Sequence, residues 1–104
     1  MLSIDNINQI IKTINNVSNP EAVYLFGSYA DGTAKEDSDL DLLVIKNNIP
    51  DKMQELLRIK KSIISDEYSI DLLLYSEEEY EHKKSQGWKL FSEIEKKGKL
   101  INVK

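Results

Sequence analysis

The sequence is poor in residues that constrain a chain: it has no cysteine, two prolines and four glycines among 104 residues. Without cysteine, a disulfide framework and a zinc–thiolate site are both excluded. No apolar run approaches the ~20 residues that a membrane-spanning helix needs. Polar residues also interrupt the first apolar stretch, which is not the pattern of a signal peptide. We therefore expect a cytoplasmic protein with no membrane partner.

Positive charge is also in short supply, with 14 Lys and Arg residues against 18 Asp and Glu residues and a net charge of −4. A basic face is the footprint of an extended nucleic-acid surface, so we do not expect such a surface here. The same balance suits a nucleotide that is held through metal ions, because carboxylates bind those ions. The length and the 40% hydrophobic content predict one globular domain, residues 1–104, with one modest core.

Hydrophobic spacing predicts short strands mixed with amphipathic helices. Helices are expected over 4–17 and 51–65, after Ser76, and around Phe91 before a C-terminal cap at Gly98. In the helix over 51–65, the residues expected near one face are Met53, Leu56, Leu57, Ile63 and Ile64. Apolar runs predict strands over 22–26, 39–45 and 69–75, with a last short strand over 100–103. This order indicates an α/β (α+β) fold in which helices cover a sheet.

The segment 25–44 contains two of the three features that point to chemistry. Gly27-Ser28 follows the first predicted strand directly. Glycine lets a ligand approach the backbone closely, and the N–H groups of such a turn can hold phosphate oxygens. The alternative is an ordinary turn, which these residue types also favour.

Asp39 and Asp41 form the second feature. Residues two apart in a strand project from the same face, so both carboxylates are expected on one side, with Cα atoms ~6.5 Å apart. Two such carboxylates repel each other unless a cation lies between them, and Mg²⁺ commonly binds one or two carboxylates together with substrate phosphates. The alternative is a strand that begins with two solvated acids.

Asp71 is the third feature, because it lies within the apolar strand predicted over 69–75. A lone acid among apolar residues is costly unless it is paired or bound to a metal. If this strand neighbours the strand over 39–45, Asp71 completes a cluster of three carboxylates. Alternatively, it is an edge-strand charge that discourages aggregation.

Together the three features resemble the nucleotidyltransferase superfamily that includes DNA polymerase β, and in particular its minimal prokaryotic members. The pattern of those members reads roughly G-S-x-A-x-G, a spacer, and S-D-x-D-L. This chain matches it at Gly27, Ser28, Ala30, Gly32, Ser38, Asp39, Asp41 and Leu42. Residues 93–103, a helix end with a basic residue two before glycine and then an apolar strand, are similar as well. The resemblance implies a polymerase β-like fold with a small mixed sheet.

The resemblance also implies an activity and a set of roles. The enzyme would transfer AMP from ATP to an acceptor hydroxyl. Asp39, Asp41 and Asp71 would be the catalytic residues and would hold two Mg²⁺ ions, and Asp71 could also accept the hydroxyl proton. Gly27, Ser28 and Ser38 would bind the nucleotide.

Minimal members that this chain resembles are typically encoded beside a small HEPN-domain protein, as the antitoxin of a toxin–antitoxin pair. The resemblance therefore implies a HEPN toxin as partner, AMP transfer to a tyrosine of that toxin, and a homo- or hetero-oligomer. Two alternatives stay open. One is a weakly catalytic or non-catalytic antitoxin that acts by contact alone, and the other is an enzyme that modifies a small molecule such as an aminoglycoside.

One position departs from the pattern. The residue before the second glycine is often basic in these proteins, and here it is Asp31. An acid at this place weakens the attraction for nucleotide phosphates. Lys35 and Lys46 are the two candidates to supply the missing positive charge.

Overall fold

The structure, a computed structural model, describes residues 1–103. These residues form, in chain order, α1 (Ile4–Ser18), β1 (Ala22–Phe26), α2 (Ser28–Asp31), β2 (Leu40–Ile45), α3 (Lys52–Ile63), β3 (Ile70–Tyr75), α4 (Glu77–Ser85), α5 (Lys89–Lys97) and β4 (Lys99–Val103). The predicted helices and strands are therefore confirmed, although several ends differ by one or two residues. No helix within residues 1–103 is both long and apolar enough to cross a bilayer.

The four strands form one sheet in the order β3-β2-β1-β4. Strand β1 runs antiparallel to both β2 and β4, whereas β2 and β3 are parallel. A parallel pair needs a crossover connection, and α3 supplies it. The predicted mixed sheet is thus confirmed, with β2 and β1 at its centre and β3 at an edge.

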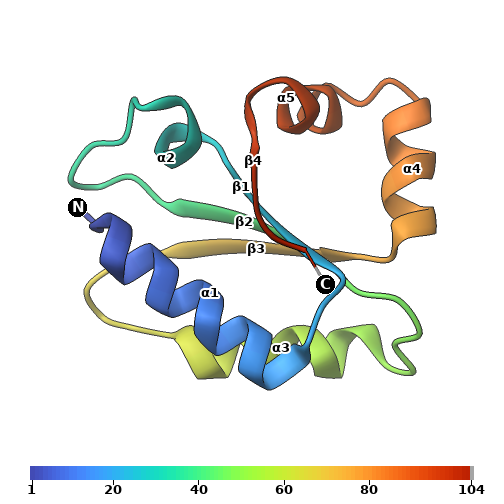
Figure 1. Cartoon of the computed structure of the whole chain (residues 1–104), viewed down its shortest axis with the longest axis horizontal. Helices are drawn as coiled ribbons and strands as arrows, with labels where there is room; N and C mark the ends of the chain where they lie inside the picture. Colours follow the sequence, from blue (N-terminus) through green and yellow to red (C-terminus); the bar gives the residue numbers. More distant parts are fainter. Residues whose placement is uncertain (104) are drawn as a thin grey trace.

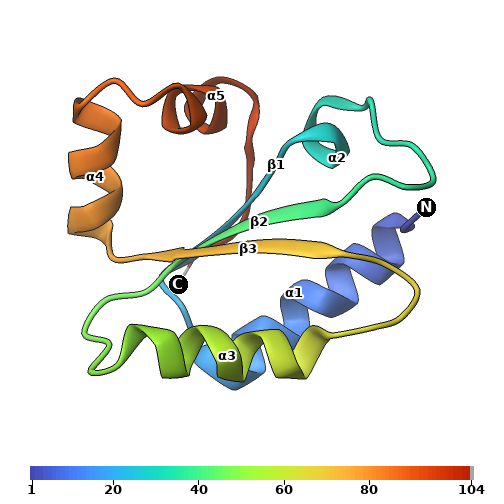
Figure 2. The ribbon, with the colours of Figure 1, turned by 180° about the vertical axis from the view of Figure 1, so that it is seen from behind.

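Helices cover both faces of the sheet. Figures 1 and 2 show α1 and α3 side by side on one face, and α4 and α5 on the other. Strand residues alternate between the faces: Leu40, Leu42 and Val44 pack in the core with α1 and α3, and Leu43 and Ile45 pack in the smaller core with α4 and α5. The sheet therefore separates two cores, where the sequence analysis expected one.

Local signals explain where the helices begin and end. Ser76 and Glu79 form the predicted capping box at the start of α4, and Ser3 with Asn6 forms another at the start of α1. Helix α1 ends at Asn19, which takes the left-handed conformation (φ 51°) and donates its N–H to the carbonyl of Asn15 at 3.0 Å. Asn tolerates this conformation better than most residues.

The prediction for α3 was wrong in part. Met53, Leu57 and Ile64 are exposed (63%, 49% and 82%), and the face toward the core consists of Leu56, Ile59 and Ile63. These three residues recur at spacings of three and four, which is the helical period. Other apolar residues on the same helix hid that stripe. The helix also ends at Ile63, two residues earlier than predicted.

Candidate functional site

Asp41 and Asp71 lie opposite each other on neighbouring strands. The register of the parallel pair places Asp41 of β2 beside Asp71 of β3, and neighbouring strands are ~4.8 Å apart. Their neighbours at the next same-face positions, Leu43 and Leu73, belong to the core under α4 and α5. Both carboxylates therefore point to the same face of the sheet, near the N-terminal ends of the two strands.

The electrostatics of this pair are unfavourable without a cation. Partial burial, the charge of Asp71, a hydrogen bond with Asp71 and the charge of Asp39 together raise the pKa of Asp41 to about 6, and burial has the largest effect. Each of these effects disfavours the charged form of Asp41. A cation between the carboxylates would reverse the effect, as expected for a group that binds metal ions.

Gly27 fits closely against Asp41. Its φ is +73°, which favours glycine, and a Cβ atom placed on it would lie 2.1 Å from Oδ2 of Asp41. Only a residue without a side chain fits at this distance. The turn that leads from β1 into α2 thus presses its backbone onto the carboxylate, and the Gly-Ser feature and the Asp-x-Asp feature become parts of one site.

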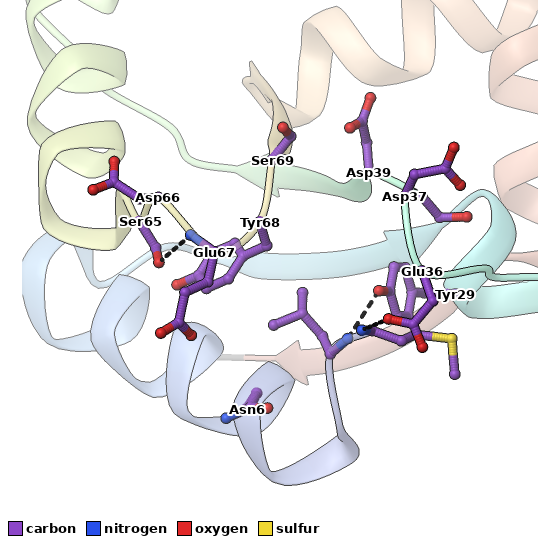
Figure 3. A pocket seen from close by; sticks show the side chains of 13 residues that line it. Asn6, Tyr29, Glu36, Asp37, Asp39, Ser65, Asp66, Glu67, Tyr68 and Ser69 are labelled. Atoms are coloured by element: carbon purple, nitrogen blue, oxygen red, sulfur yellow. Dashed lines mark hydrogen bonds and ion pairs between the residues drawn. The ribbon is translucent and has the colours of Figure 1, made fainter.

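Asp39 occupies a different position from the predicted one. Strand β2 begins at Leu40, so Asp39 precedes the strand, although its charge still acts on Asp41. It lines a pocket of about 470 Å³ with Glu36, Asp37, Asp66 and Glu67. Figure 3 shows its carboxylate pointing away from Asn6 of α1.

The three predicted acids are therefore a close pair, Asp41 and Asp71, with Asp39 nearby. Within residues 1–103, no group of three or more His, Cys, Asp or Glu side chains is arranged to hold a metal ion by itself. A complete protein cage is not required for Mg²⁺, because this ion commonly binds one or two carboxylates and takes its other ligands from water and substrate phosphates.

The two serines of the motif are placed differently. Ser28 is half-buried at the start of α2, directly after Gly27. Its carbonyl oxygen accepts the N–H of Thr33 at 3.0 Å. Ser38 Oγ accepts the N–H of Lys35 at 2.8 Å and closes the turn before Asp39. The geometry of Ser38 shows a role in holding this turn, and its predicted contact with nucleotide stays a prediction.

Asp31 is engaged in its own turn. Its Oδ1 accepts the N–H of Thr33 at 3.1 Å and the hydroxyl of Thr33 at 2.6 Å. These two hydrogen bonds lower the pKa of Asp31, and the charge of Lys97 lowers it further. Asp31 is exposed and stays charged at neutral pH, so its negative charge persists beside the Gly-Ser turn.

Lys46 does not supply the missing positive charge, and this expectation was wrong. Lys46 follows the C-terminal end of β2, and its Nζ donates to the carboxylate of Glu55 at 2.9 Å and to the carbonyl of Ser18. Asp41 lies near the other end of the same strand. Lys35 is exposed in the loop before β2, and the pockets next to the acids are lined by other residues.

A second pocket lies between Asp41 and α5. It measures about 330 Å³ and is lined by Gly27, Asp41, Phe26, Leu90 and Lys97, together with Asp31, Glu93 and Gly98. Lys97 was not among the residues predicted for this site. Its signal was the run Lys96-Lys97-Gly98, which reads equally well as a helix C-terminus, where cations are favourable.

A sheet with helices on both faces, paired acids on adjacent strands and a Gly-Ser turn against one of them define a nucleotidyltransferase domain. The sequence matches the family described as polymerase beta, nucleotidyltransferase over residues 8–104, and the chain belongs to this family.

Two curated relatives give a narrower comparison. The chain is 32% identical to the protein adenylyltransferase MntA of Shewanella oneidensis over 69 residues, which are 65% of this chain and 50% of that protein. It is 46% identical over 43 residues to a protein of Methanocaldococcus jannaschii whose assignment as a protein adenylyltransferase is itself an inference, covering 41% of this chain and 29% of that one. The chain spans at most about half the length of these relatives.

Solved structures confirm the fold. A nucleotidyltransferase structure from Sulfolobus solfataricus has a TM-score of 0.63 at 20% identity, covering 96% of this chain and 79% of that chain. A toxin–antitoxin structure with AMP-PNP has a TM-score of 0.64 at 22% identity, covering 93% and 73%. A complex of the tri-AMPylated HEPN toxin of Shewanella oneidensis with its MNT antitoxin has a TM-score of 0.54 at 20% identity, covering 95% and 71%.

Proposed function

We propose that this protein transfers AMP from ATP to a hydroxyl group of a partner protein. The observation that carries the proposal is the in-register pair Asp41 and Asp71, with the backbone of Gly27 held against Asp41. Family membership gives the reaction class. The names of two relatives, both protein adenylyltransferases, support AMP as the transferred group and a protein as the acceptor.

The pair fits Mg²⁺ on two counts. Asp41, whose pKa is raised by burial and by the charge of Asp71, favours a neighbouring cation, and Gly27 leaves space beside Asp41 that a Cβ atom would fill. We propose that Asp41 and Asp71 hold Mg²⁺ together with phosphate oxygens, and that the exposed side chain of Asp39 adds a third carboxylate. Bound there, two Mg²⁺ ions would neutralise the phosphates and lower the pKa of the acceptor hydroxyl.

The protein's own residues position the reacting groups. The Gly27–Ser28 turn directs backbone N–H groups toward the phosphates next to Asp41, and Ser28 adds its hydroxyl. In the reaction, the acceptor oxygen bonds to the α-phosphorus as the bond from that phosphorus to pyrophosphate breaks. The hydroxyl proton passes to Asp71, which is exposed at the sheet edge and is therefore accessible to an acceptor.

We further propose that the acceptor is a tyrosine of a HEPN-domain toxin and that the chain acts as the antitoxin. One structural relative was crystallised as an MNT antitoxin with a tri-AMPylated HEPN toxin, and another as a toxin–antitoxin complex with AMP-PNP. The net charge of −4 suits such a partner better than an extended nucleic-acid surface.

The test is to incubate the protein with Mg²⁺, α-labelled ATP and lysate from the native host, and then to separate the proteins. We expect one labelled band whose label disappears with Asp41→Asn and with Asp71→Asn. The matched control is Asp51→Asn, which makes the same charge change at the N-cap of α3, where Asn caps equally well. This control should keep the label.

Two outcomes would contradict the proposal. If the label appears on a small molecule and on no protein, the acceptor class is wrong. If Asp41→Asn still suppresses the toxicity of the partner in cells, the chain works as an antitoxin by contact and not by catalysis.

A further inference from the structure

The nucleotide site proposed above is surrounded by negative charge. Asp41 and Asp71 form its centre, Asp39 lies close by, and Asp31 takes the position next to the second glycine. A triphosphate is strongly anionic, and Lys and Arg side chains commonly bind phosphate groups by charge-assisted hydrogen bonds. Neither Lys35 nor Lys46 lines the pocket that contains Asp39 or the pocket that contains Asp41 and Asp31.

Lys97 is placed to supply this charge. It lies in the last turn of α5 and lines the same pocket as Gly27, Asp41 and Asp31. Among the described residues, it is the one lysine or arginine that lines either of these two pockets. The lowered pKa of Asp31 also places Lys97 within electrostatic reach of that carboxylate.

The existing partner of Lys97 holds it only loosely. Its Nζ lies 3.8 Å from Oε2 of Glu93, one turn earlier on the same helix, and 64% of the Lys97 side chain is exposed. Exposed pairs at this spacing stabilise a helix by only about 0.3–0.5 kcal/mol. A phosphate group therefore competes easily with Glu93 for the ammonium group.

We propose that Lys97 is the phosphate-binding cation of this site, reaching from α5 to take the place of the basic residue that is missing at position 31. The inference rests on the proposed function, since it names a nucleotide-positioning residue for that reaction. Asp31 opposes Lys97 in this arrangement, because the two charges face the same pocket and attract each other. Binding of a nucleotide thus draws Lys97 from two carboxylates, Asp31 and Glu93.

The test is a titration of the purified protein with ATP and Mg²⁺, followed by calorimetry. We expect Lys97→Ala to weaken binding of MgATP about tenfold, as expected for the loss of one charge-assisted contact. Lys97→Arg should keep most of the affinity. The matched control is Lys96→Ala, which removes the same charge from the neighbouring position outside the pocket and should change affinity less than about twofold.

Four further measurements sharpen the result. The effect of Lys97→Ala should be larger for ATP than for AMP, and it should shrink as salt is added, because salt screens exposed charges. Asp31→Asn should tighten MgATP binding about threefold, since it removes a like charge and a competitor for Lys97. Reversing both charges, in Asp31→Lys with Lys97→Glu, should restore affinity relative to Lys97→Glu alone.

The outcomes separate the two proposals. If wild-type protein binds MgATP and Lys97→Ala binds it as tightly as Lys96→Ala does, the role of Lys97 is overturned while the proposed function stands. If wild-type protein does not bind MgATP, the proposed function fails, and this inference fails with it.

Discussion

The charged groups at the two ends of strand β2 have opposite surroundings. After its C-terminal end, Lys46 donates to Glu55 at 2.9 Å, and Glu55 also accepts from Ser18 at 2.6 Å and from Arg58 at 2.8 Å. Near its N-terminal end, Asp41 lies beside Asp71, like charge against like charge. One end of the strand joins α1, β2 and α3 and stabilises the fold. The other end costs stability, and a bound cation and nucleotide would recover that cost.

The pKa values express the same difference. Burial by itself would raise the pKa of Glu55, but hydrogen bonds from Ser18, Lys46 and Arg58 and the charge of Lys46 outweigh burial and lower the pKa to about 2. At Asp41 all the causes act in one direction and raise the pKa to about 6. Where a carboxylate has cationic and hydrogen-bonding partners, its role is structural. A carboxylate that faces other carboxylates, as Asp41 does, is a candidate for binding a cation.

The largest effect is expected when the site is filled with a methyl group. Gly27→Ala places Cβ against the carboxylate of Asp41 and should reduce AMP transfer by at least ~100-fold, because small misplacements of reacting groups are that costly. The positive φ should also reduce the free energy of unfolding by at least about 1 kcal/mol. Labelling assays and urea denaturation measure the two effects.

Gly87→Ala is the matched control for Gly27→Ala. Gly87 has a similar φ of +76°, but a Cβ atom there meets nothing within 4 Å. This variant should lose comparable stability and keep AMP transfer. If both variants transfer AMP equally well, the close approach of Gly27 to Asp41 is not needed for activity.

The second prediction concerns the ion pair of Lys46 and Glu55 at the C-terminal end of β2. Glu55→Gln leaves Lys46 without its carboxylate and should reduce the free energy of unfolding by about 2 kcal/mol at pH 7, somewhat less than for a fully buried pair. A lowered native pKa stabilises the fold above the unfolded pKa, near 4.5, and this contribution is lost as the pH falls toward 2. Wild type and variant should therefore converge in urea denaturation at low pH.

The control for this change is Glu81→Gln, because Glu81 is paired with Lys84 at 3.1 Å but is 64% exposed. It should change the free energy of unfolding by less than about 0.5 kcal/mol. Equal losses in both variants would show that burial of the Glu55 pair has no energetic importance.

The third and smallest effect is expected when the repulsion between Asp41 and Asp71 near the N-terminal end of β2 is removed. A raised native pKa means that stability falls as the pH rises from the unfolded pKa, 3.8, through about 6. Asp41→Asn removes this cost and should stabilise the metal-free protein by about 1 kcal/mol at pH 8, after allowance for solvent screening, with little effect at pH 4. Thermal unfolding in EDTA measures it.

Added Mg²⁺ should then reverse the order of the two proteins. It should raise the Tm of wild type at pH 8 and leave Asp41→Asn unchanged, since only wild type has the paired carboxylates. If Asp41→Asn is less stable than wild type in EDTA at pH 8, the charged Asp41 side chain does not reduce the free energy of unfolding, and the prediction is wrong.

Much of this site could be predicted from the sequence, because local patterns determine it. Alternation within the strand places Asp41 on the face opposite Leu40 and Leu42, and the Gly-Ser turn follows a strand as expected. The pairing of Asp41 with Asp71 depended on whether two strands are neighbours, which only the fold decides. From the sequence, this pairing could be predicted only on the condition that the two strands are neighbours.

The features of the site that could not be predicted from the sequence depend on contacts between segments that are distant along the chain. The closeness of Gly27 to Asp41, the position of Lys97 across a pocket from Asp31 and the capture of Lys46 by Glu55 all arise from tertiary packing. Lys46 lies close to the motif in sequence, but the fold pairs it with Glu55. Lys97 is distant in sequence, and the fold brings it from α5 to the pocket that contains Asp41.

The unequal size of the two cores on either side of the sheet also has a consequence for the mobility of the helices. Asp41 and Asp71 lie on strands whose opposite face packs against α1 and α3 in the larger core. Helix α5, which carries Lys97, packs in the smaller core. Local opening needs least free energy where the fewest apolar contacts are broken. Backbone amides of α5 should therefore exchange with deuterium faster than those of α1, and one wall of the pocket would move to admit nucleotide while the carboxylates stay fixed.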